Sequence, residues 1–588
     1  MVQLDPYRGS SRKLVISIDI GTTYSGVAYC VLDPGEIPKV LSVTRFPGQE
    51  GENKSRDVKI PSVLYYDQHD QLRAAGAEAT LQSTKEEAYT QEWNDVKWFK
   101  LYLRPPSILP GAVLPPIDVN KPVINILADF LAYVFQCAKD FISETNPIGK
   151  QILTSNIPID FVLSHPNGWL GPQQNNMRRA AILAGLVPDS VEGASRLQFV
   201  TEGEASLQFC IATGLGDDVI KKNNYVTIVD CGGGTIDLST YRVLGDQPIT
   251  VEESVVPECL IQGSTMINRR AEELLREKLR LSRFSTTDDV DAMMANFDSM
   301  TKPTFRDSST ASYIKFGGPR DTDERYNIRR GVLSLSGSEM TSLFKPSVDA
   351  IKSAIDAQVS GVNARLVTIL LVGGFATSPF LRAELRTHTS RKGLRMFSPE
   401  GQTSKAVAEG ALWFYLDHRV RARVARHTYG SLYEAWYQPS KSDHFRRRHL
   451  AYTFPNGSLV VPSAFAILTR KGISVTETTE FSFPFASYSN RLDKHTISAD
   501  VISYRGDKAN PEWKDEEPDM FSTLCTIKAV PAISSWQKKN DGSIGPYWSQ
   551  NYNVILLLGL TEMKAQITWL ENGVQHQTPA TIVYDNEQ

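Results

Sequence analysis

The amino-acid sequence predicts a duplicated α/β fold followed by a C-terminal domain made mainly of β-strands. One strand–turn–strand pattern occurs at residues 15–29 (VISIDIGTTYSGVAY) and recurs at 226–241 (VTIVDCGGGTIDLSTY). Strand-like and helical stretches alternate as far as residue 427, which is typical of α/β architecture. From residue 428, short β-branched and aromatic runs lie between turn-forming residues.

Two domains follow from these patterns. We expect an α/β domain of two duplicated lobes at 14–427 and a β-rich, sandwich-like domain at 428–588, without a helical lid. Runs such as 465–470 and 496–504 are its expected strands. A chain of 588 residues is also too long for one hydrophobic core.

The bulk composition is that of an ordinary soluble protein, with 41% hydrophobic and 22% charged residues. A formal net charge of -3 gives no reason to expect nucleic acid or a membrane as partner. The most apolar stretch, 123–138, contains Asp129 and has helical spacing, so it predicts an amphipathic core helix. A polar N-terminus without a signal peptide favours a cytoplasmic location, with nuclear shuttling left open. Six scattered cysteines indicate reduced thiols rather than disulfides or zinc.

The repeated hairpin has the chemistry of a phosphate site. Asp19 and Asp230 each end an apolar run and are followed by Gly/Thr turns. Glycines let the main chain approach a ligand, and successive backbone N–H groups suit phosphate oxygens. Two such tips facing each other can hold a polyphosphate and its metal. One such turn is weak evidence for a phosphate site, but two such turns in the right order are strong evidence for one.

A third glycine turn follows the apolar strand at 366–380 (LVTILLVGGFATSPF). Gly373 and Gly374 leave bare backbone on which the flat ring of an adenosine can lie. Ser378 and Pro379 have the character of an N-cap and a first-turn proline, so we expect a helix to begin there.

These three turns, in this order, resemble those of the actin, sugar-kinase and heat-shock-70 ATPase superfamily. The segments 201–206 (TEGEAS) and 405–411 (KAVAEGA) are similar to the two connecting motifs of the seventy-kilodalton heat-shock proteins. The departures from the main family suggest its divergent twelfth branch. The resemblance implies an actin-like, ribonuclease-H-like duplicated ATPase fold over residues 14–427.

The resemblance also implies roles for individual residues. Asp19, Asp230 and Asp237 would serve the metal ions, Mg²⁺ and K⁺. The catalytic set would be Lys97, Glu202, Asp230 and Thr235. Nucleotide contacts would come from Asp19, Gly21, Thr22, Thr23, Tyr24, Gly232, Gly233, Gly234, Thr235, Gly373, Gly374, Asp298 and Lys302. The residues alone leave Lys97 open as a surface lysine, and Asp237 as the outward polar residue of an edge strand.

Some features depart from the family pattern. Thr377 stands where members usually place an arginine, and Asp298 and Lys302 are the polar residues left in the adenine-binding helix. Loss of a stacked guanidinium removes about 1 kcal/mol or more of nucleotide affinity. The junction at 419–427 is basic rather than apolar and acidic. The second basic cluster, 446–449, is open to two interpretations, a nuclear-localisation or nucleic-acid patch and a solvated helix end or loop.

The function expected from the resemblance is that of a heat-shock-70-like chaperone with weak ATPase activity. It would use ATP/ADP, Mg²⁺ and K⁺, and would bind a client or partner protein through the C-terminal domain, with co-chaperones. One alternative is a nucleotide-sensing scaffold with little hydrolysis. A second is a small-molecule kinase of the same superfold. Cys231, inside the second turn, is either a redox-sensitive thiol or a small buried spacer.

Overall fold

The computed structural model divides the chain into two compact units. The first comprises Met1–Trp169 and Asn176–Arg419, and the second comprises Val420–Gln588 with Leu170–Asn175. The residues described are 4–50, 58–104, 114, 116–155, 157–169, 171–214, 220–246, 248–362, 367–399, 405–476, 478–491, 496–541, 545–559, 563–579 and 581–582. The last expected residues of the C-terminal domain, 583–588, lie outside them.

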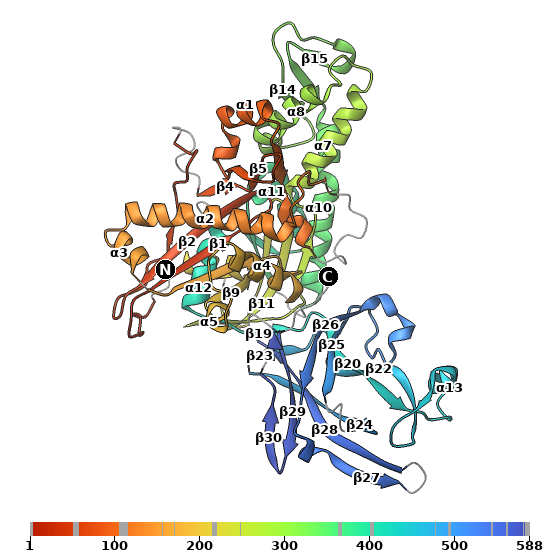
Figure 1. Cartoon of the computed structure of the whole chain (residues 1–588). Helices are drawn as coiled ribbons and strands as arrows, with labels where there is room; N and C mark the ends of the chain where they lie inside the picture. Colours follow the sequence, from red (N-terminus) through yellow and green to blue (C-terminus); the bar gives the residue numbers. More distant parts are fainter. Residues whose placement is uncertain are drawn as a thin grey trace. The chain divides into compact units, whose positions relative to one another are not determined.

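Two large sheets of the first unit have the same strand order and directions. Figure 1 draws their strands as arrows among the helices of this unit. Each sheet contains a central antiparallel hairpin whose first strand pairs in parallel with a later strand. The first sheet runs β3 (Leu41–Ser42), β2 (Tyr24–Leu32), β1 (Lys13–Asp19), β8 (Ile159–His165), β9 (Leu197–Thr201), with β4 (Lys59–Pro61) also on β2. The second contains β12 (Ile249–Glu253), β11 (Ile236–Asp246), β10 (Tyr225–Cys231), β17 (Val367–Val372), β18 (Arg395–Phe397), with β13 (Glu258–Leu260) on β11.

Two smaller three-stranded sheets complete the β-structure described in the first unit. They are β6 (Leu72–Ala75), β5 (Val63–Tyr66), β7 (Asn94–Lys97), and β14 (Ser312–Lys315), β16 (Val332–Leu335), β15 (Ile328–Arg329). The shorter helices are α1 (Gln82–Thr90), α3 (Gly149–Thr154), α4 (Gly171–Leu183), α5 (Val191–Ser195), α8 (Thr287–Asn296) and α9 (Lys302–Thr304). The longer ones include α7 (Ser264–Leu279) and α10 (Gly337–Ser360).

The amphipathic helix expected at 123–138 is confirmed as α2 (Val123–Thr145). Its apolar side chains, Leu131 and Val134 among them, are buried in the core beneath the first sheet. Asp129 is accommodated because its carboxylate accepts a hydrogen bond of 2.8 Å from the hydroxyl of Tyr66. In the part of the chain that the structure describes, no helix is both long and apolar enough to cross a membrane.

The two segments that resemble connecting motifs form a helix pair. They are α6 (Glu202–Ala212) and α12 (Ala406–Leu416), which share a hydrophobic cluster with β1 and β8. The backbones approach so closely that a Cβ at Gly410 would lie 1.8 Å from the carbonyl oxygen of Ala205. Glycine at 410 therefore permits the contact on which the position of Glu202, at the start of α6, depends.

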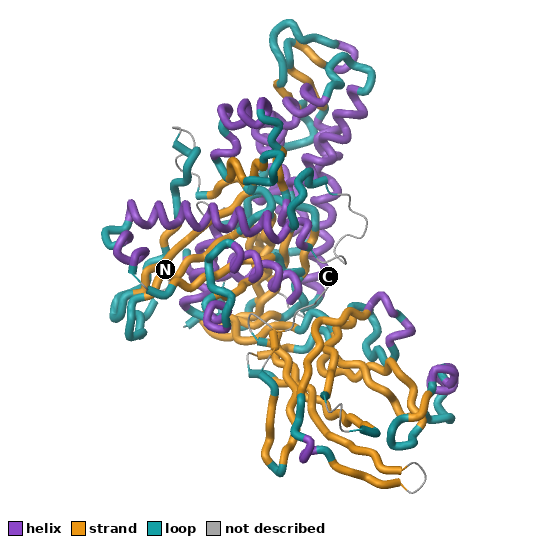
Figure 2. Tube along the Cα trace, in the orientation of Figure 1, coloured by secondary structure: helices purple, strands orange, loops and turns teal. Residues whose placement is uncertain are grey.

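The second unit consists mainly of strands and loops (Figure 2). One antiparallel sheet runs β21 (Tyr452–Thr453), β22 (Leu459–Thr469), β20 (Thr428–Trp436), β25 (Ile497–Tyr504), β26 (Phe521–Ala529). The other runs β24 (Glu480–Ser489), β28 (Gly545–Leu558), β29 (Met563–Glu571), β30 (Val574–Gln577), with β27 (Gln537–Asp541) and β31 (Thr581–Ile582) at its margins. β19 (Val420–Val424) pairs antiparallel with β23 (Ser474–Thr476). One hydrophobic cluster draws on both sheets, with Val501 from the first and Val554 from the second.

The basic cluster at 446–449 lies at the end of one short helix and at the start of a 3₁₀ turn. The helix is α13 (Ser442–Arg446), and Arg447 is buried. Its guanidinium binds Asp515 at 2.9 Å and Glu516 at 3.0 Å, and lies 4.3 Å from the ring centre of Trp513. Arg447 is therefore held by acidic and aromatic partners, whereas Arg446, Arg448 and His449 are exposed, which matches the solvated helix end or loop expected for most of the cluster.

Candidate functional site

The two Gly/Thr turns predicted from the repeated hairpin contact each other. A Cβ at Gly233 would lie 2.1 Å from Thr23 Oγ1, and one at Gly234 would lie 2.3 Å from Thr22 Oγ1. Each added Cβ would also lie within 3.0 Å of the Cβ of its threonine neighbour. Rotation of the threonine hydroxyl therefore could not relieve the clash. Only glycine fits at positions 233 and 234, and the two turns are held tip to tip.

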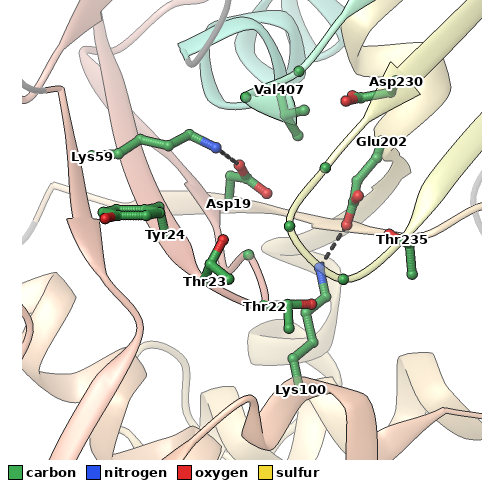
Figure 3. A pocket seen from close by; sticks show the side chains of 16 residues that line it. Asp19, Thr22, Thr23, Tyr24, Lys59, Lys100, Glu202, Asp230, Thr235 and Val407 are labelled. Atoms are coloured by element: carbon green, nitrogen blue, oxygen red, sulfur yellow. Dashed lines mark hydrogen bonds and ion pairs between the residues drawn. The ribbon is translucent and has the colours of Figure 1, made fainter. Parts of the chain in front are cut away.

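A cavity of about 270 Å³ lies at these turns (Figure 3). Its size is near the lower end of small-molecule sites, which run from about 300 to 1,000 Å³. It is lined by Asp19, Gly21, Thr22, Thr23, Tyr24, Lys59, Lys100, Glu202, Asp230, Gly232, Gly233, Gly234, Thr235, Gly373, Gly374 and Val407. The structure thus brings together most of the nucleotide-binding residues expected from the sequence.

Asp19 ends β1 and is held by two partners. Lys59 Nζ donates to its Oδ2 at 2.7 Å, and Ser164 Oγ, from β8, donates to its Oδ1 at 2.7 Å. Burial raises the pKa of Asp19, but the charges of Lys59 and Lys100 outweigh burial and hold this pKa below its usual range. Asp19 is therefore a buried carboxylate in its charged form.

Glu202 begins α6 and forms the second ion pair of the cavity. Its Oε1 accepts a hydrogen bond of 2.5 Å from Lys100 Nζ, whose side chain is only 5% exposed. Burial lowers the pKa of Lys100, but the charges of Glu202 and Asp19 outweigh burial, and the pKa is raised. The ammonium also lies 5.6 Å from the ring centre of Trp169, a favourable contact for a cation. Lys100 is therefore a fixed positive charge.

Asp230 and Asp237 lie opposite each other in the register of β10 and β11. Asp230 lines the cavity and accepts a hydrogen bond of 2.7 Å from Ser206 Oγ. Burial, with the charge of Glu202, raises the pKa of Asp230 to about 7. Asp237 is not among the lining residues; it accepts the backbone N–H of Asn167 at 2.6 Å. Burial and Glu202 raise the pKa of Asp237 to about 8.

Lys97, the lysine expected to be catalytic, does not line the cavity. It ends β7, pairs with Asp95, and its side chain is 56% exposed. The cavity lysine is Lys100, three residues further along. Trp98 between them has a φ of 56°, the left-handed conformation, and the 3₁₀ helix at Phe99–Leu103 begins directly after it. This kink turns the chain after β7. Lys97 is therefore exposed, as in the alternative interpretation of it as a surface lysine.

Asp298 and Lys302, expected at the adenine, are also absent from the cavity lining. Each contacts Asn268 of α7, through hydrogen bonds of 2.9 and 2.8 Å, and the two form an ion pair with each other. The sequence could not predict this contact, because Asn268 lies on a helix that is distant in the chain from Asp298 and Lys302. These two residues therefore belong to a polar cluster, with Asp298 inside the π-helical turn at Phe297–Thr301 and Lys302 directly after it.

The third glycine turn lies where the sequence predicts it. Gly373 and Gly374 line the cavity, and Gly373 has a φ of 93°. A Cβ at Gly373 would lie 2.4 Å from Asp230 Oδ1, so this turn packs directly on the carboxylate. Ser378 caps α11 (Pro379–Arg391), accepting the N–H of Leu381 at 3.4 Å, as the sequence predicts.

The six cysteines are all unbridged, as expected. Burial and the charges of Asp230 and Asp237 raise the pKa of the Cys231 thiol well above its ordinary value. A reactive thiol needs a lowered pKa and access to solvent. Cys231 is fully buried, so its geometry matches the small spacer rather than the redox-sensitive thiol.

The side chains around Asp19 can be matched against the needs of a divalent cation. Carboxylates and phosphate oxygens are the ligands that Mg²⁺ prefers. Among the described residues, however, no group of three His, Cys, Asp or Glu side chains could hold a metal ion. Both oxygens of Asp19 have partners, and Lys59 already neutralises its charge. As arranged, the residues at Asp19 do not fit a divalent cation.

Comparison with known proteins shows which proteins this chain resembles in sequence. No family model matches the chain. Curated relatives do match, and they are heat-shock-70-type proteins. Heat shock 70 kDa protein 12B of Homo sapiens is 23% identical over 508 residues, which cover 72% of this chain and 71% of the relative. Heat shock 70 kDa protein 12A of Mus musculus is 24% identical over 503 residues, with 71% of each chain covered. The chain is therefore a divergent relative of the heat shock 70 kDa protein 12 proteins.

The raised pKa values predict how stability changes with pH. The folded chain keeps protons on Asp230 and Asp237 that the unfolded chain releases above its carboxyl pKa of 3.8. The free energy of unfolding should therefore fall as pH rises from about 4 to about 8. Asp237→Asn, which can still accept the N–H of Asn167, should flatten this slope by on the order of 1 kcal/mol per pH unit.

Urea denaturation at pH 5 and pH 8 measures this slope. Asp95→Asn is the control, because Asp95 is 43% exposed and lies outside the cavity lining. An Asp237→Asn variant with the same slope as the wild type would show that Asp237 is ionised in the folded chain.

Proposed function

We propose that the first unit is an actin-like domain of two lobes that binds ATP or ADP between the Asp19 and Asp230 turns and hydrolyses ATP slowly. One observation carries the proposal. Two glycine turns interlock at the lining of a cavity that also contains two lysines. The repeated strand order and the relatives of the heat-shock-70 class support it.

The lining suits the phosphates of a nucleotide. Backbone N–H groups of turns such as Gly232–Gly233–Gly234 are donors for phosphate oxygens, and lysine is a good phosphate binder as a point charge. Lys59 and Lys100 are both within the lining. A Cβ at Gly374 would meet no atom within 4 Å, so the backbone there is open to an adenosine.

Hydrolysis needs positioning and charge neutralisation more than covalent chemistry by the protein. In this proposal Lys100 neutralises charge that develops on the γ-phosphate. Glu202, fixed by Lys100 and by the start of α6, accepts a hydrogen bond from the attacking water. The water oxygen forms a bond to the γ-phosphorus while the bond to the bridging oxygen breaks, which leaves ADP and phosphate. Lys100 takes the role that the sequence assigned to Lys97.

Lys100→Met should abolish most turnover, because it removes the charge at the γ-phosphate, whereas Lys97→Met should turn over like the wild type. Single-turnover hydrolysis of ATP, with equilibrium nucleotide binding measured in parallel, makes the comparison. We expect Lys100→Met to lose about 100-fold or more in rate, in the range typical for removing one electrostatic stabiliser.

Three other results are informative. Equal rates in the two variants would contradict the role of Lys100. Binding without turnover in the wild type would favour a nucleotide-sensing scaffold. Transfer of the γ-phosphate to a small hydroxyl compound rather than to water would favour the kinase alternative.

We infer further that the second unit binds a client or partner protein. A groove of about 510 Å³ is lined by residues of both its large sheets. Trp436, Phe454 and Tyr488 meet there, with ring centres 5.5–6.1 Å apart, and Trp436 is 43% exposed. Exposed aromatic side chains supply much of the binding energy at protein interfaces.

Reduced, carboxymethylated α-lactalbumin is a permanently unfolded probe for this groove. Fluorescence anisotropy of the labelled probe should show binding to the wild type that weakens at least about 10-fold in Trp436→Ala/Tyr488→Ala, a loss of about 1.4 kcal/mol. Tyr89→Ala is the control, because Tyr89 is an 86% exposed aromatic residue of the first unit. Equal binding by all three proteins would contradict a role for the groove.

A further inference from the structure

Lys59 is a built part of the cavity rather than a surface lysine that happens to reach it. It lies on β4, whose pairing with β2 places Lys59 opposite Gly26. A Cβ at Gly26 would come within 3.3 Å of Lys59 Cγ, so the lysine stem lies over a position that has no side chain. The Lys59 side chain is 19% exposed and that of Asp19 is 4% exposed. Strand pairing and stem packing together fix the ammonium at Asp19.

We propose that Lys59 is a built-in counter-ion of the phosphate site, which takes the place of a divalent cation at Asp19 and binds the nucleotide phosphates directly. Nucleotide binding by this chain therefore does not require a divalent cation. This inference rests on the proposed function, because it concerns the same cavity.

The hydrogen-bonding capacity of Lys59 supports this role. An ammonium has three N–H donors. The structure gives Lys59 one hydrogen bond, to Asp19, and no other acceptor among the described residues. Two N–H groups therefore remain for phosphate oxygens at a position that lines the cavity. Figure 3 shows the ammonium of Lys59 and that of Lys100 each directed at its own carboxylate.

A divalent cation at Asp19 would have to displace this arrangement. Mg²⁺ loses its water reluctantly and is usually held by phosphates with one or two carboxylates. At Asp19 it would meet a positive charge 2.7 Å from Oδ2, while Oδ1 is occupied by Ser164. Like charges at such a distance repel strongly where water is excluded. The cation and Lys59 therefore compete for one carboxylate.

The test is the dissociation constant for ADP, measured by isothermal titration calorimetry in excess Mg²⁺ and in excess EDTA. For the wild type we expect the two values to differ by less than about 3-fold. Lys59→Met should bind at least about 10-fold more weakly in EDTA and should regain affinity in Mg²⁺, because the cation can then reach Asp19. Lys97→Met is the matched control and should behave like the wild type, since Lys97 lies outside the lining.

A second readout needs no nucleotide. Binding of Mn²⁺, followed by electron paramagnetic resonance, should be at least about 10-fold tighter in Lys59→Met than in the wild type. The inference is overturned if the wild type loses 10-fold or more in ADP affinity when EDTA replaces Mg²⁺. It is also overturned if the wild type binds Mn²⁺ tightly. Both results come from the wild type alone, so neither depends on whether the variant folds. If the wild type binds ADP in neither condition, the proposed function fails, and the inference with it.

Discussion

The tip-to-tip contact of the two Gly/Thr turns is the constraint on which the rest of the site depends. Thr22 and Thr23 occupy the space that side chains at positions 233 and 234 would need. The turns sit at the ends of two hairpins whose registers fix Asp19 opposite Gly26 and Asp230 opposite Asp237. Because strand pairing is rigid and the turns have no room to slide, two carboxylates from distant parts of the chain are brought to one cavity.

Charge pairing then decides what each buried carboxylate does. Asp19 and Glu202 each have a lysine within hydrogen-bond distance, at Lys59 and Lys100. Asp230 has only a serine hydroxyl as its side-chain partner among the hydrogen bonds described, and burial raises its pKa. A buried charge is tolerated when it is paired and hydrogen-bonded. The cavity therefore contains two carboxylates that are each paired with a lysine and, at Asp230, one carboxylate whose charge changes near neutral pH.

Much of the fold could be predicted because its signals are local. The two hairpins, the amphipathic helix α2 and the Ser378 cap follow from short patterns of apolar residues, glycine and capping side chains. Runs at 465–470 and 496–504 fall largely within β22 and β25 for the same reason. Interactions between distant segments could not be read in this way. Arg447 is an example, since its acidic partners lie almost 70 residues further along the chain.

The sequence predicted the parts of the candidate site that are formed by backbone turns. It did not reveal the single side chains that also line the cavity. Lys100 was missed because the left-handed Trp98 redirects the chain between it and Lys97. Lys59 had no signal at all, since its role arises from the pairing of β4 with β2. Asp298 and Lys302 pair instead through Asn268, which only the packing of a separate helix brings to them.

The central claim is that the interlocked turns form a nucleotide site, and calorimetric titration of ATP into a Gly234→Ala variant tests it most directly. The added Cβ would lie 2.3 Å from Thr22 Oγ1, so the turns must separate. Gly318→Ala is the control, because its nearest neighbour would be an ordinary 3.7 Å away. We predict one-site binding in the wild type and the control, and binding at least about 10-fold weaker in Gly234→Ala with unchanged circular dichroism. Equal affinity in all three proteins would contradict the account.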